Sequence, residues 1–352
     1  MRRRKALATA AAILLGSAVL GEVAAMEWLV SADEPAPPSR IGETDVAALR
    51  ALTKQLLKLA RGGHPAMPKV YSAVIQRSEL LLDADATTFW ARKLRSALAE
   101  LHTNAGWYAY DVHQTDLASW HYSRAIRLGK DADDVMAVVG AAWSQATGYR
   151  ELGAPNDALK LYQLAQGHLR TKPVEGRHAA LGELDLRIAR CYADIATAEP
   201  MVEIPSLRGP AVTKLEHDEL EHLANEALAR SQDCPQPAAG VGIADRAYAR
   251  AGLELAMGRL DTAERYAANA VVLAPDGNRV AACPLVQLAT VRAVAGSSSA
   301  DQLAAEALDV VSRVRSARSR RMLAPPEKAL AARKDSTSMD LAERARALRT
   351  AA

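Results

Sequence analysis

From Gly106 to Ala125 the chain reads GWYAYDVHQTDLASWHYSRA, with small and aromatic residues at regular steps. Gly106 is followed by Ala118, Tyr122 and Ala125, at steps of 12, 4 and 3 residues. The same steps recur in two further sets, which are Ala146, Ala158, Tyr162 and Ala165, and then Ala251, Ala263, Ala267 and Ala270, with Pro275 following the last. A spacing that recurs in this way indicates an internal structural repeat.

These steps suit two antiparallel helices that approach closely, because a small residue on the first helix faces a small residue on the second. Gly153 and Gly258 lie five residues before the second small position of their repeats, where a tight turn needs a positive φ. The spacing is typical of the tetratricopeptide repeat, in which each hairpin covers the apolar face of its neighbour. The sequence therefore predicts an all-α fold, a tetratricopeptide-like right-handed helical-hairpin solenoid.

Helical periodicity extends beyond the three repeats. Apolar residues at steps of three and four predict helices over residues 44–61 and 67–82, and hairpins over 178–198 with 213–230 and over 279–295 with 300–315. The first two repeats are 40 residues apart, and the extra length at residues 129–133 lies in a longer helix or a longer connector. We expect an Arg-rich and apolar segment at 1–25, a Pro-rich linker at 26–43, the solenoid at 44–316, and a loose basic tail at 317–352 with a short helix over 341–348.

The composition excludes several classes of protein. Of 352 residues, 49% are hydrophobic and 24% are charged, which excludes wholesale disorder and a polytopic membrane protein. The net charge of +3 supplies no strong field for collecting polyanions. The three cysteines, Cys191, Cys234 and Cys283, form no CxxC pair, so we expect neither a disulfide framework nor a metal site. We find no nucleophile-elbow, P-loop, dinucleotide or HExxH motif, and we expect neither enzymatic activity nor a cofactor.

The N-terminus allows two interpretations. Arg2 to Lys5 precede an apolar run from Ala6 to Gly21, an arrangement that resembles an export signal. The run has 16 residues, fewer than the roughly 20 that span a bilayer. Residues 1–25 are therefore a signal or anchor, or an Ala-rich helix that stays with the rest of the protein. Any contact with a membrane is expected only through this segment.

Several stretches resemble the ligand-sensing domain of actinobacterial helix-turn-helix (XRE-type) transcriptional regulators. They are residues 45–55 (DVAALRALTKQ) with the glycines at 62–63, residues 99–111 (AELHTNAGWYAYD), residues 118–128, and residues 158–166 (ALKLYQLAQ). In that family a DNA-binding domain precedes an Arg-rich apolar segment and the tetratricopeptide-like domain. This sequence begins at the Arg-rich segment, so we do not expect direct DNA binding by the chain. The resemblance favours a cytoplasmic location over an exported or membrane-anchored one.

In a solenoid of this type the first helix of each hairpin lines the concave side. The positions that face inward hold aromatic and polar residues, which are Thr103, Asn104, Trp107, Tyr110, Trp143, Thr147, Arg150 and Tyr248. Trp and Tyr offer rigid contact area, Asn104 suits a peptide backbone, and Arg150 suits a carboxylate. We therefore expect a peptide or partner protein in this groove. The alternative for Trp90, Trp107 and Trp120 is that they fill the core between hairpins.

Histidines and C-terminal basic residues have simpler interpretations. His217 and His222 are five residues apart, which is poor spacing for one metal ion on a helix, and they belong to an acidic solvated face. His102, His113 and His121 are expected to serve packing or hydrogen bonds. The basic residues between Arg313 and Lys334 lack interleaved aromatic residues for stacking on nucleic acid, and are expected to form a solvated tail.

Overall fold

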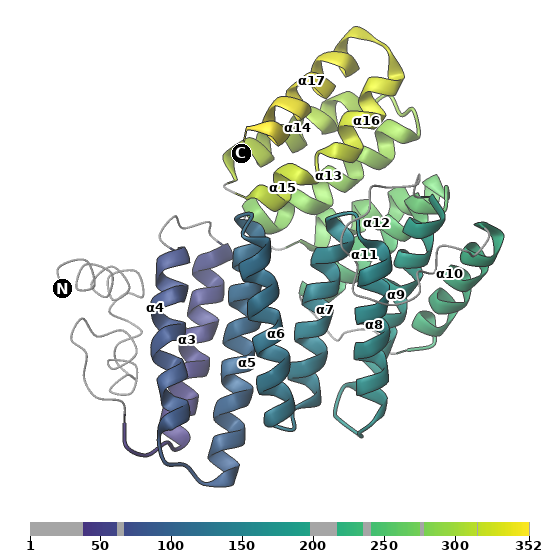
Figure 1. Cartoon of the computed structure of the whole chain (residues 1–352). Coiled ribbons are helices and arrows are strands. Elements are labelled where there is room, and N and C mark those ends of the chain that lie inside the picture. Colours follow the sequence, from purple (N-terminus) through teal and green to yellow (C-terminus); the bar gives the residue numbers. More distant parts are fainter. Residues whose placement is uncertain are drawn as a thin grey trace, which may run out of the picture. The chain divides into compact units, whose positions relative to one another are not determined.

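The computed structural model describes residues 38–61, 67–197, 217–234, 241–274, 278–314 and 316–351. All regular structure in these ranges is helical, apart from one isolated β-bridge between Arg40 and Asp85 (Figure 1). The prediction of an all-α fold is confirmed. None of these helices combines the length and apolarity that a bilayer crossing requires. The predictions for residues 1–25, for most of the linker and for Pro275 concern residues outside these ranges.

The described residues fall into two compact units, with the boundary between Gln145 and Ala146. Unit 1 contains α3 (Glu43–Arg61), α4 (Met67–Leu80), the 3-10 helix η2 (Leu81–Asp83), α5 (Thr88–Asp111), α6 (Thr115–Asp131) and the first part of α7 (Val135–Glu151). Apolar residues three and four apart place Leu49, Leu52 and Leu56 on one face of α3, where all three are fully buried. They share one core with leucines of α5, so α3 packs against α5 as well as α4.

Unit 2 contains the rest of α7, α8 (Pro155–Arg170), α9 (Arg177–Thr197), α10 (His217–Gln232), α11 (Val241–Ala256), α12 (Leu260–Leu273), α13 (Asn278–Val294), α14 (Ala300–Arg313), α15 (Ala317–Arg321), α16 (Ala324–Arg333) and α17 (Ser336–Thr350). Consecutive helices pack in pairs: α9 with α10, α11 with α12, α13 with α14, and α16 with α17. The first helices of neighbouring pairs also meet, because α9 packs against α11 and α11 against α13.

The small residues of the repeat lie where helices are closest. Every described member is buried: Gly106, Ala118, Tyr122, Ala125, Ala146, Ala158, Tyr162, Ala165, Ala251, Ala263, Ala267 and Ala270. A Cβ atom at Gly106 would lie 2.6–2.9 Å from ring atoms of Tyr122, so α5 and α6 could not approach as they do with a larger residue there. Gly153 and Gly258 have φ values of 83° and 71°, as their turns require.

Two features differ from what the sequence predicts. The extra length at residues 129–133 is mostly helical, since α6 continues to Asp131 and three residues connect it to α7. The prediction of a loose basic tail over 317–352 is wrong, because α15, α16 and a longer α17 fill that region. Leu323 and Leu330 are buried there against α13 and α14. Periodicity misses these helices because α15 is only one turn long and two prolines begin α16.

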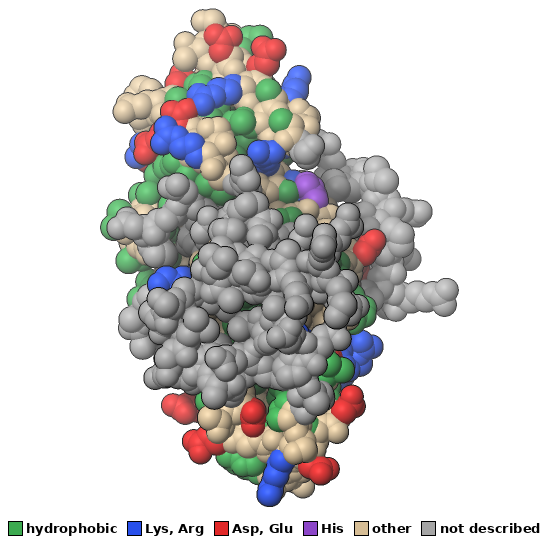
Figure 2. Space-filling model, turned by 90° about the vertical axis from the view of Figure 1, so that its left-hand side faces the viewer, with side chains coloured by type: hydrophobic (Ala, Val, Ile, Leu, Met, Phe, Trp, Pro, Cys, Tyr) green, Lys and Arg blue, Asp and Glu red, His purple; other side chains and the backbone are tan. Residues whose placement is uncertain are grey.

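Basic residues of this region are paired rather than solvated alone. Arg346 and Arg349 both bind Glu327, and Arg344 binds Asp309. Figure 2 shows basic and acidic side chains interspersed at the top of the view, where the C-terminal helices lie. Ion pairs neutralise part of the charge, but residues 317–351 contain nine Lys and Arg and only four Asp and Glu, so these helices keep a net positive charge.

Candidate functional site

The eight residues predicted to line a groove are divided between the two units. Thr103, Asn104, Trp107, Tyr110 and Trp143 lie in unit 1. Thr147, Arg150 and Tyr248 lie in unit 2. Each unit therefore holds its own candidate contact surface.

The aromatic cluster of unit 1 joins α5 to α7. The indole rings of Trp107 and Trp143 lie 6.1 Å apart, and both side chains are half-buried. Trp107 Nε1 donates a hydrogen bond of 2.9 Å to Ser144 Oγ, which holds the ring in place. Tyr110 packs 6.0 Å from Trp107 but is only 2% exposed. The two tryptophans are thus partly accessible, whereas Tyr110 belongs to the core, contrary to the prediction that it lines a groove.

The other predicted residues of α5 contribute less. The Thr103 hydroxyl donates to the carbonyl oxygen of Ala99 at 2.9 Å, so its proton is used within its own helix. Asn104 is half-buried beside it. Trp90 packs at the edge of the unit 1 core, while Trp120 is 49% exposed. The core-filling interpretation therefore fits Trp90 better than Trp120.

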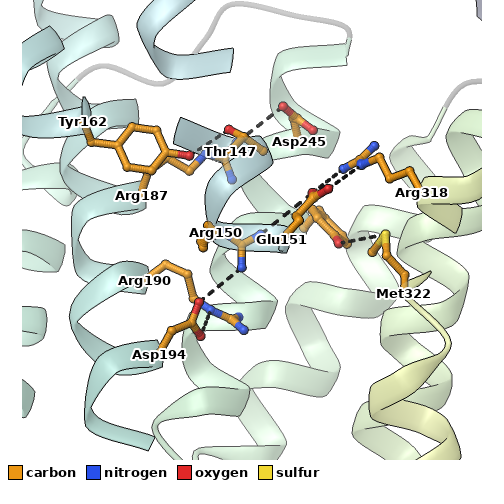
Figure 3. Close-up of polar contacts among 11 residues, drawn as sticks. Thr147, Arg150, Glu151, Tyr162, Arg187, Arg190, Asp194, Asp245, Arg318 and Met322 are labelled. Atoms are coloured by element: carbon orange, nitrogen blue, oxygen red, sulfur yellow. Dashed lines mark hydrogen bonds and ion pairs between the residues drawn. The ribbon is translucent and has the colours of Figure 1, made fainter. Parts of the chain in front are cut away.

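In unit 2, Arg150 lies at the centre of a charged cluster made of Arg150, Glu151, Arg190, Asp194 and Arg318 (Figure 3). Arg150 Nη1 donates to Asp194 Oδ2 at 3.2 Å, and Arg190 Nε donates to Asp194 Oδ1 at 2.6 Å. Arg190 and Asp194 are four residues apart on α9 and so lie on the same face. Two arginines from α7 and α9 therefore share one carboxylate.

The second acidic residue of the cluster is held by the C-terminal part of the chain. Arg318 of α15 binds both carboxylate oxygens of Glu151, at 2.7 and 2.6 Å. Arg150 Nη2 is 4.0 Å from the same carboxylate, too far for a hydrogen bond. Tyr248 of α11 lies next to the cluster, and its hydroxyl is 3.8 Å from the sulfur of Met322. The cluster thus brings together α7, α9, α11 and α15 (Figure 3).

Thr147 does not line this surface. It is buried, and its hydroxyl lies 2.7 Å from the hydroxyl of the fully buried Tyr162. The prediction that Thr147 contacts a ligand is therefore wrong, because its polar group serves the contact between α7 and α8. Arg150 and Tyr248, two of the predicted groove residues, lie close enough to influence each other electrostatically. Their contact with a ligand stays a prediction.

Burial and charge together set the protonation states. Burial alone would lower the pKa of Arg150, but Asp194 and Glu151 raise it well above its ordinary value. The pKa of Arg318 responds in the same way, with Glu151 outweighing the effect of burial. Burial, with Cys283 and Glu151 nearby, raises the pKa of Tyr248. The arginines are therefore charged and Tyr248 is neutral at any physiological pH.

Sequence reasoning missed Glu151, Arg190, Asp194 and Arg318. The pair Arg190 and Asp194 carries a local signal, the i, i+4 spacing of opposite charges on a helix. No local signal links Glu151 to Arg318, because the two residues are 167 positions apart.

Gly252 of α11 also contacts the charged cluster. A Cβ atom there would lie 2.0 Å from Arg190 Nη1, so the guanidinium of Arg190 packs directly against the backbone of α11.

Unit 1 contains a second polar group, the histidine cluster of Glu79, His102, His121 and Arg124. His102 Nε2 lies 2.8 Å from Glu79 Oε1, and its Nδ1 lies 3.0 Å from Nδ1 of His121. Arg124 binds both oxygens of Glu79, at 2.9 and 2.5 Å. The cluster therefore ties α4, α5 and α6 together, consistent with the hydrogen-bonding role predicted for these histidines.

The histidine cluster is closed to solvent at its centre. His102 is fully buried and His121 is 7% exposed. Burial, together with the neighbouring His102, lowers the pKa of His121 to about 4. Burial alone would raise the pKa of Glu79, but its bonds from Arg124 and His102 lower it to about 2. At neutral pH His121 is therefore uncharged and Glu79 is ionised.

The remaining reactive groups offer little chemistry. Among the described residues, no group of three or more His, Cys, Asp or Glu side chains could hold a metal ion. Burial raises the pKa of Cys191 to about 12, so its thiol is protonated and a poor nucleophile. A pocket at the ends of α9, α10 and α11 is lined by four alanines together with Thr197, His217, Glu221 and Met257. The charged cluster is a better candidate for a binding site than this pocket, because it brings several partly exposed charged side chains together.

The chain was also compared with known proteins. No protein-family model matches it, and no curated protein matches it either. The assignment of function therefore depends on the geometry of the charged cluster and of the aromatic cluster.

Proposed function

We propose that the chain is a non-catalytic binding module that captures a carboxylate-bearing peptide segment of a partner protein at the charged cluster. In this proposal the paired helices stack as a tetratricopeptide-like solenoid, and the first helix of each pair faces the ligand. The module resembles the sensor part of a transcriptional regulator, and we place it in the cytoplasm on the strength of that resemblance. It acts by binding, without a bound cofactor and without direct contact with DNA.

One observation carries the proposal: two half-buried arginines share a single carboxylate. Arg150 and Arg190 together carry two positive charges, and Asp194 supplies one negative charge between them. Arg190 bonds to the described residues only through Nε, which leaves both of its Nη groups able to donate. A carboxylate of a peptide would balance the excess charge and accept these hydrogen bonds in a favourable bidentate geometry.

The surroundings suit a peptide rather than a small anion. The ring of Tyr248 borders the cluster, and the stems of long charged side chains supply apolar contact area around it. A ligand several residues long would use these apolar contacts together with the arginines of the cluster.

The test is a selection of peptides from a random 12-residue library on the immobilised full chain. Binding of each selected peptide is measured by fluorescence anisotropy, with a free or an amidated C-terminus and with its acidic residues changed to amides. We expect Arg150→Ala and Arg190→Gln each to weaken binding at least 10-fold, because each removes a charged donor from the carboxylate. Trp143→Ala tests the aromatic cluster of unit 1 separately, as a contact for a partner of its own, and should cause little loss of helicity.

Arg344→Gln is the matched control, because Arg344 also pairs with a carboxylate but lies in an exposed pair on α17. It should leave peptide affinity unchanged. The proposal fails if no sequence is enriched, or if the enriched peptides bind equally well to the Arg150, Arg190 and Arg344 variants. Circular dichroism of each variant separates loss of a contact from loss of the fold. If Trp143→Ala unfolds the chain, Trp143 belongs to the core.

A further inference from the structure

The helix α15 is linked to the proposed site by a line of charges. Arg318 of α15 binds Glu151 through two hydrogen bonds of 2.6 and 2.7 Å. Glu151 is 4.0 Å from Arg150, and Arg150 is 3.2 Å from Asp194. Glu151 and Arg150 thus lie between α15 and the carboxylate site. The hydrogen bonds and ion pairs described above join α15 to Arg190 and Asp194 through these two residues, not directly.

Glu151 forms ion pairs of very different length with Arg318 and Arg150. Arg318 engages both oxygens, whereas Arg150 approaches only to the limit of an ion pair. The side chain of Glu151 is 8% exposed, so its charge cannot be satisfied mainly by water. If Arg318 moved away, Arg150, at 4.0 Å, would be within reach of the Glu151 carboxylate. Glu151 would then compete with a ligand carboxylate for the same guanidinium.

The position of Arg318 is fixed by its own short helix. Ser316 caps α15 by accepting a hydrogen bond of 3.0 Å from the amide of Ser319, and both serines are 2% exposed. At the other end of α15, Met322 lies against the hydroxyl of Tyr248. The segment continues directly into α16, whose Leu330 is buried in the core shared by α13, α14 and α17. A displacement of Arg318 would therefore move α15 and, through it, the packed helices α16 and α17.

On the basis of the proposed function, we infer that α15 senses occupancy of the carboxylate site: docking of Arg318 on Glu151 keeps Arg150 available, and a bound carboxylate in turn holds α15 in place. The coupling is reciprocal, because any contact that favours ligand binding is itself favoured by the ligand. Arg318 is a positioning residue in this scheme, since it acts on the ligand through Glu151 and Arg150. The C-terminal helices α15 to α17 are then the output of the module.

The first test is a double-mutant cycle on the affinity of a selected peptide for the full chain. Arg318→Gln should weaken binding about 10-fold, because Glu151 is released toward Arg150. Glu151→Gln should weaken it much less, since it removes the competing charge. The double variant Glu151→Gln with Arg318→Gln should bind within about threefold of the unchanged chain. A merely structural role for Arg318 predicts no such rescue, and absence of rescue would overturn the inference.

The second test follows amide hydrogen exchange in residues 316–323 of the full chain. The selected peptide should slow exchange there at least fivefold in the unchanged chain. In the double variant the peptide should still bind and still protect α9, but it should no longer slow exchange in α15. Equal protection of α15 in both proteins would contradict the coupling. The Arg344→Gln variant should behave as the unchanged chain does.

Two outcomes separate this inference from the proposed function. If peptides bind and depend on Arg150 but are indifferent to Arg318, the site stands and the coupling is wrong. If no peptide is selected, the chain alone still tests the link, because Arg318→Gln should quicken exchange in α15 at least fivefold. Unchanged exchange in that variant would show that the pair with Glu151 does not hold the helix.

Discussion

The two units each contain a line of charged and polar side chains between helices, but they differ in the balance of charge. In unit 1 the line runs from Arg124 through Glu79 and His102 to His121; both histidines are buried, while Glu79 and Arg124 keep 25% and 27% of their side-chain surface exposed. In unit 2 it runs from Arg318 through Glu151, Arg150 and Asp194 to Arg190, and most of its side chains keep 16–25% of their surface exposed.

The comparison separates a structural role from a binding role. The histidine cluster uses its donors and acceptors on its own members: both nitrogens of His102 are engaged, and so are both oxygens of Glu79. The charged cluster has three arginines for two carboxylates, which leaves a net positive charge next to solvent. Polar groups that satisfy one another hold helices together, whereas an excess of partly exposed donors can accept a ligand.

The largest effect is expected from Glu79→Ala. The change leaves Arg124 and Nε2 of His102 without their acceptor in a partly buried position, at a cost of about 3 kcal/mol in the free energy of unfolding. Urea denaturation followed by circular dichroism measures it. In unit 2, Asp194→Asn should cost clearly less, because the amide keeps one acceptor oxygen between Arg150 and Arg190. If Asp194→Asn is the more damaging change, the charged cluster is the structural one and the comparison is reversed.

Acid should destabilise unit 1 through His121. The pKa of His121 is about 4 in the folded chain and 6.5 for an ordinary histidine. Between these two pH values the unfolded chain therefore binds one more proton than the folded chain. Stability should therefore fall as the pH is lowered, by about 2 kcal/mol from pH 7 to pH 5. The groups that face His121 and its partner are His102, Glu79 and Arg124. Glu79, with a pKa of about 2, adds to the loss only below about pH 4.5.

The variant His121→Asn should remove most of this slope between pH 7 and pH 5, whatever its effect on stability at pH 7. His222→Gln is the control, because His222 is 71% exposed and lies on α10 of unit 2. It should leave the slope unchanged. A slope that survives in His121→Asn would place the acid-sensitive group elsewhere. Arg150 and Arg318 of the charged cluster remain protonated over this range.

The smallest effects come from two helical glycines, one in each unit. Gly106→Ala should destabilise the chain by about 1 kcal/mol, because the new methyl group meets the rigid buried ring of Tyr122, and the better helix propensity of alanine offsets only part of the cost. Gly252→Ala meets the guanidinium of Arg190, a flexible end that can shift, so stability should change by no more than about 0.5 kcal/mol.

Peptide affinity should show the reverse order for the two glycines. Gly252→Ala should weaken binding severalfold by displacing Arg190, and Gly106→Ala should leave the affinity of the folded chain nearly unchanged. Thermal denaturation and fluorescence anisotropy on the same two proteins measure both quantities. An unaltered affinity in Gly252→Ala would indicate that Arg190 does not contact the ligand.

Most of the helices could be predicted from the sequence, and the candidate site only in part. Small residues at fixed steps and apolar residues at helical spacing are local signals, so the helices predicted over 44–61, 67–82, 279–295 and 300–315 match α3, α4, α13 and α14 to within two residues at each end. Among the predicted inward positions, Arg150 and Tyr248 are partly exposed, whereas Tyr110 and Thr147 are buried. A shift of one or two residues rotates a helical side chain by 100–200°, so a repeat register assigned from the sequence cannot separate a groove position from a core position reliably.

The sequence by itself determined that the chain folds as paired helices, because the recurring Gly and Ala positions permit close helix contacts that larger side chains would prevent. Only the tertiary structure decided which charges meet. Arg318 reaches Glu151 across 167 residues, and Arg150 reaches Asp194 across 44. Such pairs depend on which helices become neighbours. A charged side chain on a helix looks the same in the sequence whether it ends in water, in a buried hydrogen-bonded cluster or beside a ligand.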